Sequence, residues 1–261
     1  MPVITLTTDF GQQDGYVGTM KGVILSIAPE ACIVDISHDI DPQNLREAAY
    51  ILSTAVPYFP PSTIHVVVVD SGVGSDRRPI VVRTETATFV APDNGVLSAF
   101  LDATGVHVLH ANRPEYWLPV ISRSFHGRDI FSPLGAHLAA SIPFEALGTP
   151  IADPLTFGLL RSERHADGSV RGQVLHGDRF GNLITDIPMS WLEASDRWQL
   201  EIAGRNIDGL SATYAVVERG TLIALAGSDG LLEIAVREGN AAEVLGVSPG
   251  EAVIVTPARG S

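Results

Sequence analysis

Apolar and polar positions alternate between two patterns along the first half of the chain, apolar runs and helical spacing. Runs of β-branched and other apolar residues predict short strands at residues 3–8, 33–36, 64–69, 80–83 and 88–91. Apolar side chains spaced three and four residues apart predict helices at residues 18–28, 42–56, 94–101 and 132–141. The run at 64–69 is apolar at nearly every position, which is typical of a parallel strand covered on both faces. The first half is therefore predicted to be a Rossmann-like α/β domain with a mostly parallel sheet.

The second half shows closely spaced apolar segments between turn residues, with little helical spacing. Strands are predicted at residues 169–178, 181–186, 198–202, 214–217, 222–226, 232–235 and 252–256. Short strands with frequent turn signals favour a small β-barrel or sandwich. A polar stretch with glycine and proline breakers separates the two halves. We expect an N-terminal α/β domain at residues 1–155, a linker at 156–171 and a C-terminal β-barrel domain at 172–261.

Composition narrows the classes of partner and compartment. The 261 residues carry a formal charge of −13, and nucleic acid or an anionic membrane is not expected as a partner, because those surfaces require a basic patch. The single cysteine, Cys32, excludes an intramolecular disulfide framework and the usual cysteine-based zinc sites. The start of the chain does not resemble a signal peptide, and no later stretch reaches the ~20 apolar residues that span a bilayer. A cytoplasmic protein is expected.

Polar side chains follow two of the predicted strands, where ligands of open α/β sheets bind. Asp9 and Asp70 each stand at such a strand end. A carboxylate there can accept hydrogen bonds from ribose hydroxyls or bind a metal, but it can equally cap a helix or form a turn. The glycine-rich turn after Asp70 can bring Arg77 back beside it, as part of a site or as a structural salt bridge. His126 can serve as a base, a proton shuttle or a ligand. Asp70, Arg77 and His126 include no good nucleophilic side chain, which favours water as the reactant.

The predicted barrel contributes a second group of candidates. Residues 177–182 join two predicted strands and combine a carboxylate, an aromatic ring and an amide. Asn182 can bond a purine edge, Phe180 can stack on the purine face, and Asp178 suits an ammonium group. A simple hairpin turn is the alternative. Neighbouring segments add one aromatic and two polar candidates, which ordinary sheet composition would also explain: Tyr214, Ser228 and Glu233.

Six motifs occur in order along the chain: Thr-Thr-Asp-Phe-Gly at residues 7–11, Asp-Ser-Gly-Val-Gly at 70–74, Ala-Pro-Asp-Asn-Gly at 91–95, Phe-His-Gly-Arg-Asp at 125–129, Asp-Arg-Phe-Gly-Asn at 178–182 and Ser-Asp-Gly-Leu-Leu-Glu-Ile-Ala at 228–235. Together they resemble the S-adenosyl-L-methionine (SAM) hydrolases, also called SAM hydroxide adenosyltransferases, which are relatives of fluorinase and chlorinase. The resemblance extends from about residue 3 to residue 255.

The resemblance implies hydrolysis of SAM to adenosine and L-methionine by attack of an activated water on the ribose C5′ carbon, with neither a metal nor a cofactor. It also implies a homotrimer whose active sites lie between the N-terminal domain of one subunit and the barrel of its neighbour. The implied catalytic residues are Asp70, Arg77 and His126. The implied substrate site has nine members: Asp9 for the ribose hydroxyls; Phe180, Asn182 and Tyr214 for adenine; Asp178, Ser228 and Glu233 for the methionine part; and Tyr16 and Phe125 beside them.

The resemblance also distinguishes water from halide as the nucleophile. Halide-using relatives carry an aromatic residue where Asp70 stands, a hydroxyl residue in place of Arg77, and Tyr-Ser in place of His126 and Gly127. They also have an inserted loop after the strand predicted at 80–83, which this chain lacks. Water is therefore the implied nucleophile. The chain departs from the usual family pattern at three positions: Ser71, Gly227 and Asp186.

Two other functions are compatible with the candidate residues. A metal-dependent hydrolase of a nucleoside-type substrate would use four oxygen and nitrogen ligands: Asp9, Asp70, His126 and Asp129. The fixed charge of Arg77 would compete with such a metal. A non-catalytic SAM- or adenosine-binding module would need only the binding residues, and the complete set of catalytic candidates disfavours it.

Overall fold

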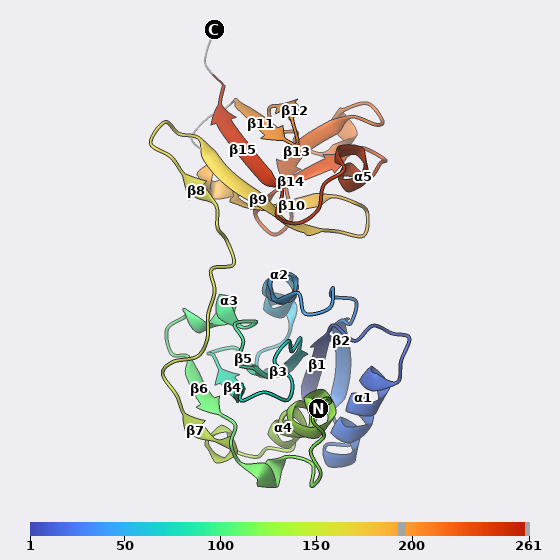
Figure 1. Ribbon diagram of the computed structural model, residues 1–261, viewed down its shortest axis with the longest axis vertical. Coiled ribbons are helices and arrows are strands. Elements are labelled where there is room, and N and C mark those ends of the chain that lie inside the picture. The colour runs from blue at the N-terminus through green and yellow to red at the C-terminus, as the bar shows by residue number, and fades with distance from the viewer. Residues whose placement is uncertain (193–196, 259–261) are drawn as a thin grey trace. The chain divides into compact units, whose positions relative to one another are not determined.

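The computed structural model describes residues 1–192 and 197–258. The chain divides into two compact units, Met1–Phe157 and Gly158–Ser261 (Figure 1). Each unit is built around its own sheet and has its own buried hydrophobic clusters.

A mixed seven-stranded sheet with the order β2-β1-β3-β5-β4-β6-β7 forms the N-terminal unit. Its strands are β1 (Val3–Thr8), β2 (Cys32–Ser37), β3 (Thr63–Val68), β4 (Pro79–Arg83), β5 (Ala87–Pro92), β6 (His107–His110) and β7 (Thr149–Pro150). The first four strands in this order run parallel, and the other three add antiparallel pairs. The predicted α/β sheet is confirmed, and the strands predicted at 80–83 and 88–91 pair antiparallel as β4 and β5, whereas β6 and β7 were not predicted. Thr8 and Val68 pair at the carboxyl ends of β1 and β3, so Asp9 and Asp70 emerge at the same edge of the sheet.

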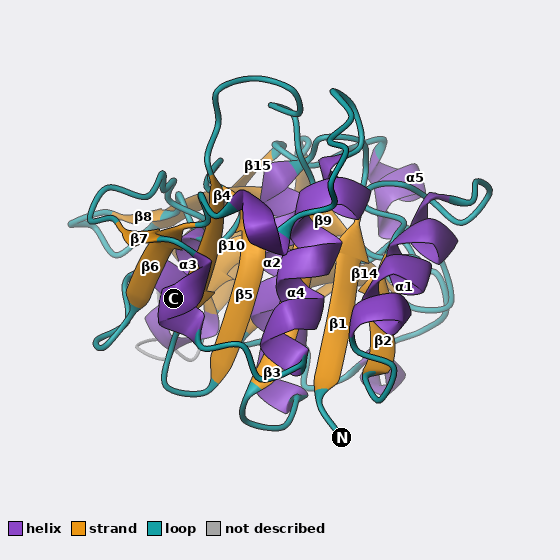
Figure 2. Ribbon diagram, turned by 90° about the horizontal axis from the view of Figure 1, so that it is seen from below, coloured by secondary structure: helices purple, strands orange, loops and turns teal. Residues whose placement is uncertain are grey.

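Helices cover both faces of this sheet (Figure 2). They are α1 (Tyr16–Ile27), α2 (Leu45–Ala55), α3 (Ser98–Leu101) and α4 (Ser132–Ala139), with 3-10 helices at Val56–Tyr58, Pro114–Tyr116 and Phe144–Leu147 and a π-helix at Gly127–Phe131. Successive side chains of β3 enter different cores. Val66 belongs to the cluster of Met20 and Leu134, whereas Val67 belongs to the cluster of Leu52. Burial on both faces explains the continuous apolar run of β3.

The helix predicted at residues 94–101 is wrong in its first half, because only Ser98–Leu101 is helical. Gly95 adopts φ +93°, and a Cβ atom there would lie 2.6 Å from Cδ1 of Phe157. The left-handed turn and the close approach of the aromatic ring both require glycine. The helix therefore begins after this turn.

The C-terminal unit is a nearly closed, antiparallel, barrel-like sheet with the order β12-β11-β15-β9-β10-β14-β13, and β8 pairs with β9. Its strands are β8 (Glu163–Arg164), β9 (Val170–Gly177), β10 (Leu183–Pro188), β11 (Trp198–Ile202), β12 (Arg205–Asp208), β13 (Leu222–Ala226), β14 (Leu231–Val236) and β15 (Ala252–Pro257). A bridge between Ser211 and Leu225 joins the chain after β12 to β13 and nearly closes the sheet. This arrangement confirms the predicted barrel.

Three features of the C-terminal unit differ from the sequence prediction. The strand predicted at residues 214–217 is wrong, because Tyr214–Val216 forms a 3-10 helix. The carbonyls of Ala215 and Val217 accept hydrogen bonds from Nη1 of Arg237, so these carbonyls do not pair with a strand. The helix α5 (Ala241–Leu245) and a 3-10 helix at Met189–Trp191 were not predicted either.

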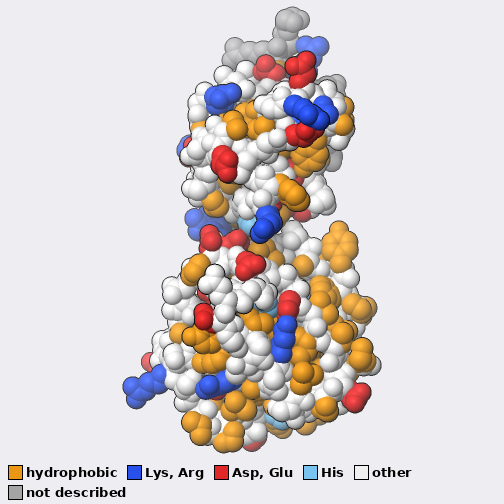
Figure 3. All heavy atoms as spheres, turned by 90° about the vertical axis from the view of Figure 1, so that its right-hand side faces the viewer, with side chains coloured by type: hydrophobic (Ala, Val, Ile, Leu, Met, Phe, Trp, Pro, Cys, Tyr) orange, Lys and Arg blue, Asp and Glu red, His pale blue; other side chains and the backbone are white. Residues whose placement is uncertain are grey.

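The surface mixes charged and apolar side chains. On the face that Figure 3 shows, acidic and basic side chains are scattered among hydrophobic ones. Several large apolar side chains are exposed on the two units, among them Tyr58, Val120, Phe180 and Val216. In the part of the chain that the structure describes, no helix is long and apolar enough to cross a membrane.

Candidate active site

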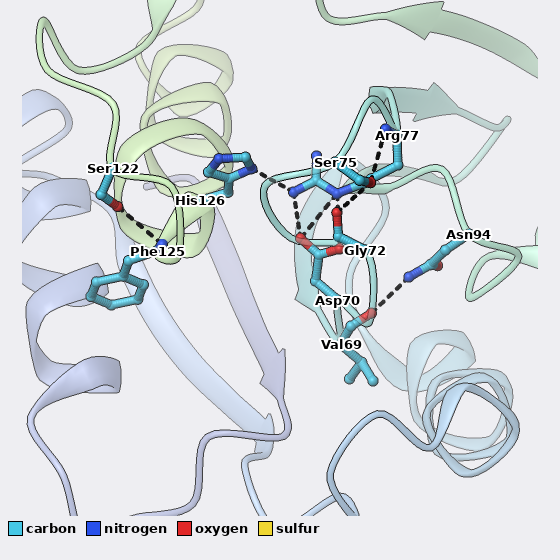
Figure 4. Close-up of polar contacts among 9 residues, drawn as sticks. All are labelled: Val69, Asp70, Gly72, Ser75, Arg77, Asn94, Ser122, Phe125 and His126. Carbon is cyan, nitrogen blue, oxygen red and sulfur yellow. Dashed lines mark hydrogen bonds and ion pairs between the residues drawn. The ribbon is translucent and has the colours of Figure 1, made fainter.

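Asp70, Arg77 and His126 meet in the N-terminal unit, although they come from two distant segments (Figure 4). Nε of Arg77 donates to Oδ1 and Oδ2 of Asp70 at 2.8 and 3.0 Å. Nη2 of Arg77 contacts Oδ2 of Asp70 and also lies 2.7 Å from Nδ1 of His126. The side chains of Arg77 and Asp70 are only 9% and 5% exposed. The guanidinium therefore joins a carboxylate and an imidazole in a largely dry setting, where charged hydrogen bonds are strong.

The turn after β3 returns Arg77 to Asp70. The amide of Ser75 donates to the Gly72 carbonyl at 3.0 Å, and the Ser75 hydroxyl donates to the same carbonyl at 2.6 Å. Gly74 adopts φ +78°, and a Cβ atom there would lie 2.5 Å from the carbonyl oxygen of Arg123. Gly74 thus permits both the bend and the close approach of the segment that leads to His126. Ser71, a departure from the family pattern, is exposed and does not close this turn.

The segment before His126 is held by a buried carboxylate. Asp129 is fully buried within the π-helix, and its Oδ2 accepts a hydrogen bond from the Ser122 amide at 2.7 Å. The Ser122 hydroxyl in turn accepts from the Phe125 amide at 3.0 Å. Burial raises the pKa of Asp129, but hydrogen bonds from Arg128 and Ser122 outweigh it and hold that pKa below its usual value. Asp129 is therefore charged and engaged in holding the loop.

Burial and the contact with Arg77 both favour the neutral form of His126. Burial lowers the pKa of His126, and the charge of Arg77 lowers it further, against opposing effects of Asp70, Asp129 and the Ser122 backbone. Guanidinium N–H groups only donate hydrogen bonds, so Nδ1 of His126 is the acceptor in its contact with Nη2. The neutral ring then carries its proton on Nε2.

A cavity of about 220 Å³ adjoins these residues. Asp9, Asp70, Phe125 and His126 line it together with Gln43, which the sequence analysis missed. The backbone N–H of Gln43 donates to Oδ2 of Asp9 at 2.8 Å, and Gln43 has φ +64°. A left-handed glutamine gives little signal in sequence, because that conformation is ordinarily marked by Gly, Asn or Asp.

Tyr16 lies beside the cavity-lining rings of Phe10 and Phe125. The Tyr16 and Phe125 ring centroids are 5.2 Å apart at an interplanar angle of 80°, and Phe10 lies 5.8 Å from each of them. Edge-to-face contacts of this kind are favourable for aromatic rings. Tyr16 is half exposed, so the cluster offers apolar surface to a ligand as well as to the core.

The second group of candidates forms a separate cluster on the C-terminal unit. Oδ1 of Asp178 accepts from the amides of Phe180 and Asn182 at 2.9 and 2.8 Å. Nδ2 of Asn182 donates to Oδ2 of Asp178 at 2.9 Å. Asp178 thus closes the turn that presents the Phe180 ring, which is 77% exposed. A cavity of about 580 Å³ is lined by Phe180, Asn182 and Tyr214.

Glu233 extends this cluster. The Tyr214 hydroxyl donates to Oε1 of Glu233. Burial raises the pKa of Glu233, and the charges of Asp178 and Asp229 raise it further, against the hydrogen bond from Tyr214. Burial and Glu233 also raise the pKa of Tyr214. The electrostatic potential at this site is therefore negative, which favours binding of a cation. Ser228 lies on the exposed turn between β13 and β14.

Asp186, another departure from the family pattern, has a structural position. It is fully buried, and its Oδ1 and Oδ2 accept from the amides of Gln173 and Arg161 at 2.8 and 2.9 Å. The carboxylate thereby ties the segment before β8 to the barrel.

The alternative with four metal ligands is not supported by the geometry. Among the described residues, no group of three or more His, Cys, Asp and Glu side chains could hold a metal ion. Arg77 instead occupies the place between Asp70 and His126, and Asp129 faces Arg128 and Ser122.

Comparisons with known proteins agree with the resemblance that the motifs indicated. Residues 4–148 match the family model of the SAM hydroxide adenosyltransferase N-terminal domain, and residues 172–254 match that of its C-terminal domain. An (R)-S-adenosyl-L-methionine hydrolase from Thermus thermophilus is 38% identical over 96% of this chain and 98% of its own length. A fluorinase from Nocardia brasiliensis is 27% identical over 90% of each chain.

A solved structure, described as an uncharacterized conserved protein from Thermotoga maritima, has the same fold. It superposes with a TM-score of 0.90 at 36% identity and covers 97% of this chain and 99% of its own. The similarity therefore extends over both units.

Proposed function

Because the chain belongs to the SAM hydroxide adenosyltransferase family, we propose that it hydrolyses SAM to adenosine and L-methionine. The observation that carries this proposal is the contact of one Arg77 nitrogen with both Asp70 and His126 at the wall of a cavity. These groups can hydrogen-bond and polarise a water molecule. They include no Ser, Thr, Cys or Lys nucleophile, and both oxygens of the Asp70 carboxylate are held by Arg77.

The reaction balances without a co-reactant other than water. The water oxygen forms a bond to C5′ of the ribose while the C5′–S bond breaks. The electron pair of that bond passes to sulfur, which becomes the neutral thioether of methionine, and the water loses one proton. A sulfonium is already a good leaving group, so the protein's task is to orient the water in line and to stabilise its developing hydroxide character.

Each catalytic residue has a role in that task. Arg77 supplies positive charge beside the water and, by its hydrogen bonds, fixes the positions of Asp70 and His126. Asp70 and His126, both lining the cavity, hydrogen-bond the water and receive or relay its proton. The low exposure of Asp70 and Arg77 strengthens these interactions relative to open water.

The substrate contacts are proposed from the two clusters. Asp9, with one oxygen fixed by Gln43, is suited to the ribose hydroxyls. Asn182 and Phe180 are suited to the adenine edge and face, with Tyr214 beside them. The methionine part carries an ammonium, which the electronegative surroundings of Glu233 favour. Asp178 and Ser228 complete that side, and Tyr16 and Phe125 provide apolar contact.

We also propose a homotrimer in which the N-terminal unit of one subunit and the barrel of another form each site. Two partial clusters on different units and exposed apolar side chains support this arrangement.

Mixed trimers test the arrangement. Asp70→Ala and Asn182→Ala subunits, each inactive alone, would recover activity when refolded together, because random assembly leaves about a quarter of the sites with both residues intact. A monomer by light scattering, or mixed trimers without activity, would contradict it.

The hydrolase proposal is tested by incubating purified protein with SAM and following adenosine and methionine by chromatography. Adenosine and methionine are expected in equal amounts, before and after exhaustive chelation. Loss of turnover on chelation would favour a metal-dependent hydrolase. SAM binding by calorimetry without product would favour a binding module. Either result would overturn the proposal.

A further inference from the structure

A buried histidine lies next to the strand end that leads to Asp9. His38 follows β2 and is 1% exposed. Its Nδ1 lies 2.8 Å from the hydroxyl of Thr8, the last residue of β1. Its Nε2 lies 3.1 Å from Oδ1 of Asp35, an electrostatic contact rather than a well-aligned hydrogen bond. Nζ of Lys21 donates to the other oxygen of Asp35 at 2.6 Å. A continuous series of polar contacts thus runs from half-buried Lys21 to fully buried Thr8.

His38 holds the turn at residues 8–11 at both ends. Its ring contacts Thr8, and its carbonyl accepts from the Gly11 amide at 2.8 Å. Inside the turn, the Phe10 amide donates to the Thr8 hydroxyl at 3.3 Å. Gly11 adopts φ +68°, which lets the chain bend back toward His38. Asp9 and Phe10 lie between these two anchors.

The directions of these hydrogen bonds form one consistent set. The Thr8 hydroxyl accepts from the Phe10 amide and still has its own proton to donate to Nδ1 of His38. The ring proton then lies on Nε2, facing Asp35. Burial raises the pKa of Asp35, but Lys21 and His38 outweigh it and hold that pKa below its usual value. A charged Asp35 therefore favours the tautomer with the proton on Nε2, in which Nδ1 accepts from the Thr8 hydroxyl.

The turn bears on both parts of the candidate active site. Asp9 lines the cavity, where it is proposed to hold the ribose hydroxyls. The Phe10 ring packs against Phe125, the residue before His126. A Cβ atom at Gly127 would lie 3.3 Å from the Phe10 ring, so there is little room between the turn and the segment that carries His126. A displaced turn would move Asp9 away from the substrate.

We propose that His38 is a positioning residue that fixes Asp9 for the ribose hydroxyls, acting through the Thr8 hydroxyl and its own carbonyl. His38 is buried and makes no contact with substrate in this role. The inference rests on the proposed function for the identity of the substrate, and its test includes a binding measurement that does not need turnover.

Two substitutions test the connection. His38→Leu removes the ring nitrogens, and Thr8→Val removes only the hydroxyl at constant shape. Each is expected to raise KM for SAM, and Kd for adenosine by calorimetry, about ten-fold, with a smaller change in kcat. Thr8→Ser, which keeps the hydroxyl, is expected to retain most of the affinity. In an Asp9→Ala background, neither substitution should weaken binding further, because the residue they position is gone.

His65 provides a matched control. It is also fully buried, and its Nδ1 also lies close to a buried threonine hydroxyl of β1, at 2.7 Å from Thr5. His65→Asn is expected to lower the melting temperature without changing KM or Kd.

Thr8→Val decides the question if His38→Leu fails to fold. Unchanged affinity in folded Thr8→Val protein, or a weakening that adds in full to that of Asp9→Ala, would overturn the inference. Failure of the proposed function is a separate result, since wild-type protein would then release no adenosine from SAM. In that case the adenosine Kd values still decide whether His38 acts through Asp9.

Discussion

Nη2 of Arg77 lies 2.7 Å from Nδ1 of His126 while the same guanidinium holds the carboxylate of Asp70. This contact connects the strand-end carboxylate to the imidazole and leaves His126 neutral, with its proton on Nε2. The guanidinium also lies over the Phe131 ring, with Cζ 5.0 Å from the ring centroid. A planar, delocalised cation is therefore required at this position, rather than positive charge alone.

Arg77→Lys keeps the charge but loses the forked contact with Asp70 and the stacking on Phe131. We expect kcat for SAM hydrolysis to fall about a hundred-fold or more, because a group that stabilises developing charge is misplaced, with a smaller change in KM. The adjacent Arg78 is the matched control, since its guanidinium bonds Asp93 and Asp153. Steady-state kinetics of both variants provide the measurement. Equal losses in Arg77→Lys and Arg78→Lys would contradict a specific role for Arg77.

The pH dependence of kcat/KM follows from His126. Its pKa lies below the usual 6.5, first because of burial and then because of Arg77. Protonation would place a second positive charge against Arg77, so activity should fall as the pH falls through that lowered pKa and be retained above it. The acidic limb of the profile is expected below pH 6.5. A midpoint above 6.5 would show that another group, or a different protonation state of His126, governs the reaction.

Gly74→Ala tests the close approach of the two segments. Alanine at φ +78° is strained, and its Cβ atom would lie 2.5 Å from the Arg123 carbonyl oxygen, which precedes the segment of His126. Gly209→Ala is a matched control, because Gly209 has φ +75° but open space at the Cβ position. Both changes should cost about 1 kcal/mol of stability or more from backbone strain. Only Gly74→Ala should also reduce kcat, by about ten-fold or more. Similar kcat values for the two folded variants would argue that the close contact between Gly74 and the Arg123 carbonyl does not matter for catalysis.

His65 makes stability depend on pH. Burial lowers its pKa to about 4, whereas the unfolded chain has the usual 6.5. The unfolded state therefore binds more protons between these values, and stability is lost as the pH falls below 6.5 until it reaches about 4. We expect a loss of about 2 kcal/mol between pH 7.5 and pH 5 from this residue. Urea unfolding of wild type and His65→Gln at both pH values measures the difference. The same pH dependence in the variant would contradict the assignment.

Much of the fold could be predicted from the pattern of apolar residues. The run at 64–69 identified β3, because burial on both faces demands apolar side chains at successive positions. The 3-10 helix at Tyr214–Val216 could not be predicted, because the carbonyls of Ala215 and Val217 accept hydrogen bonds from Arg237, which is distant in sequence. Local composition gives no sign of such a partner.

The candidate site shows the same division. The positions of Asp9 and Asp70 after strands pointed to one sheet edge, and the structure places both there. The role of Gln43 could not be predicted, because it depends on a left-handed backbone that glutamine does not signal. The place of His38 depends on a buried contact with Thr8 from another strand, which hydrophobic patterning does not reveal.

Attack of water on C5′ of SAM is tested most directly by turnover in ¹⁸O-labelled water, with the products analysed by mass spectrometry. Adenosine is expected to carry one ¹⁸O atom at its 5′ hydroxyl, together with one equivalent of unlabelled methionine. Adenosine without the label, or no adenosine from folded protein, would contradict the proposed reaction.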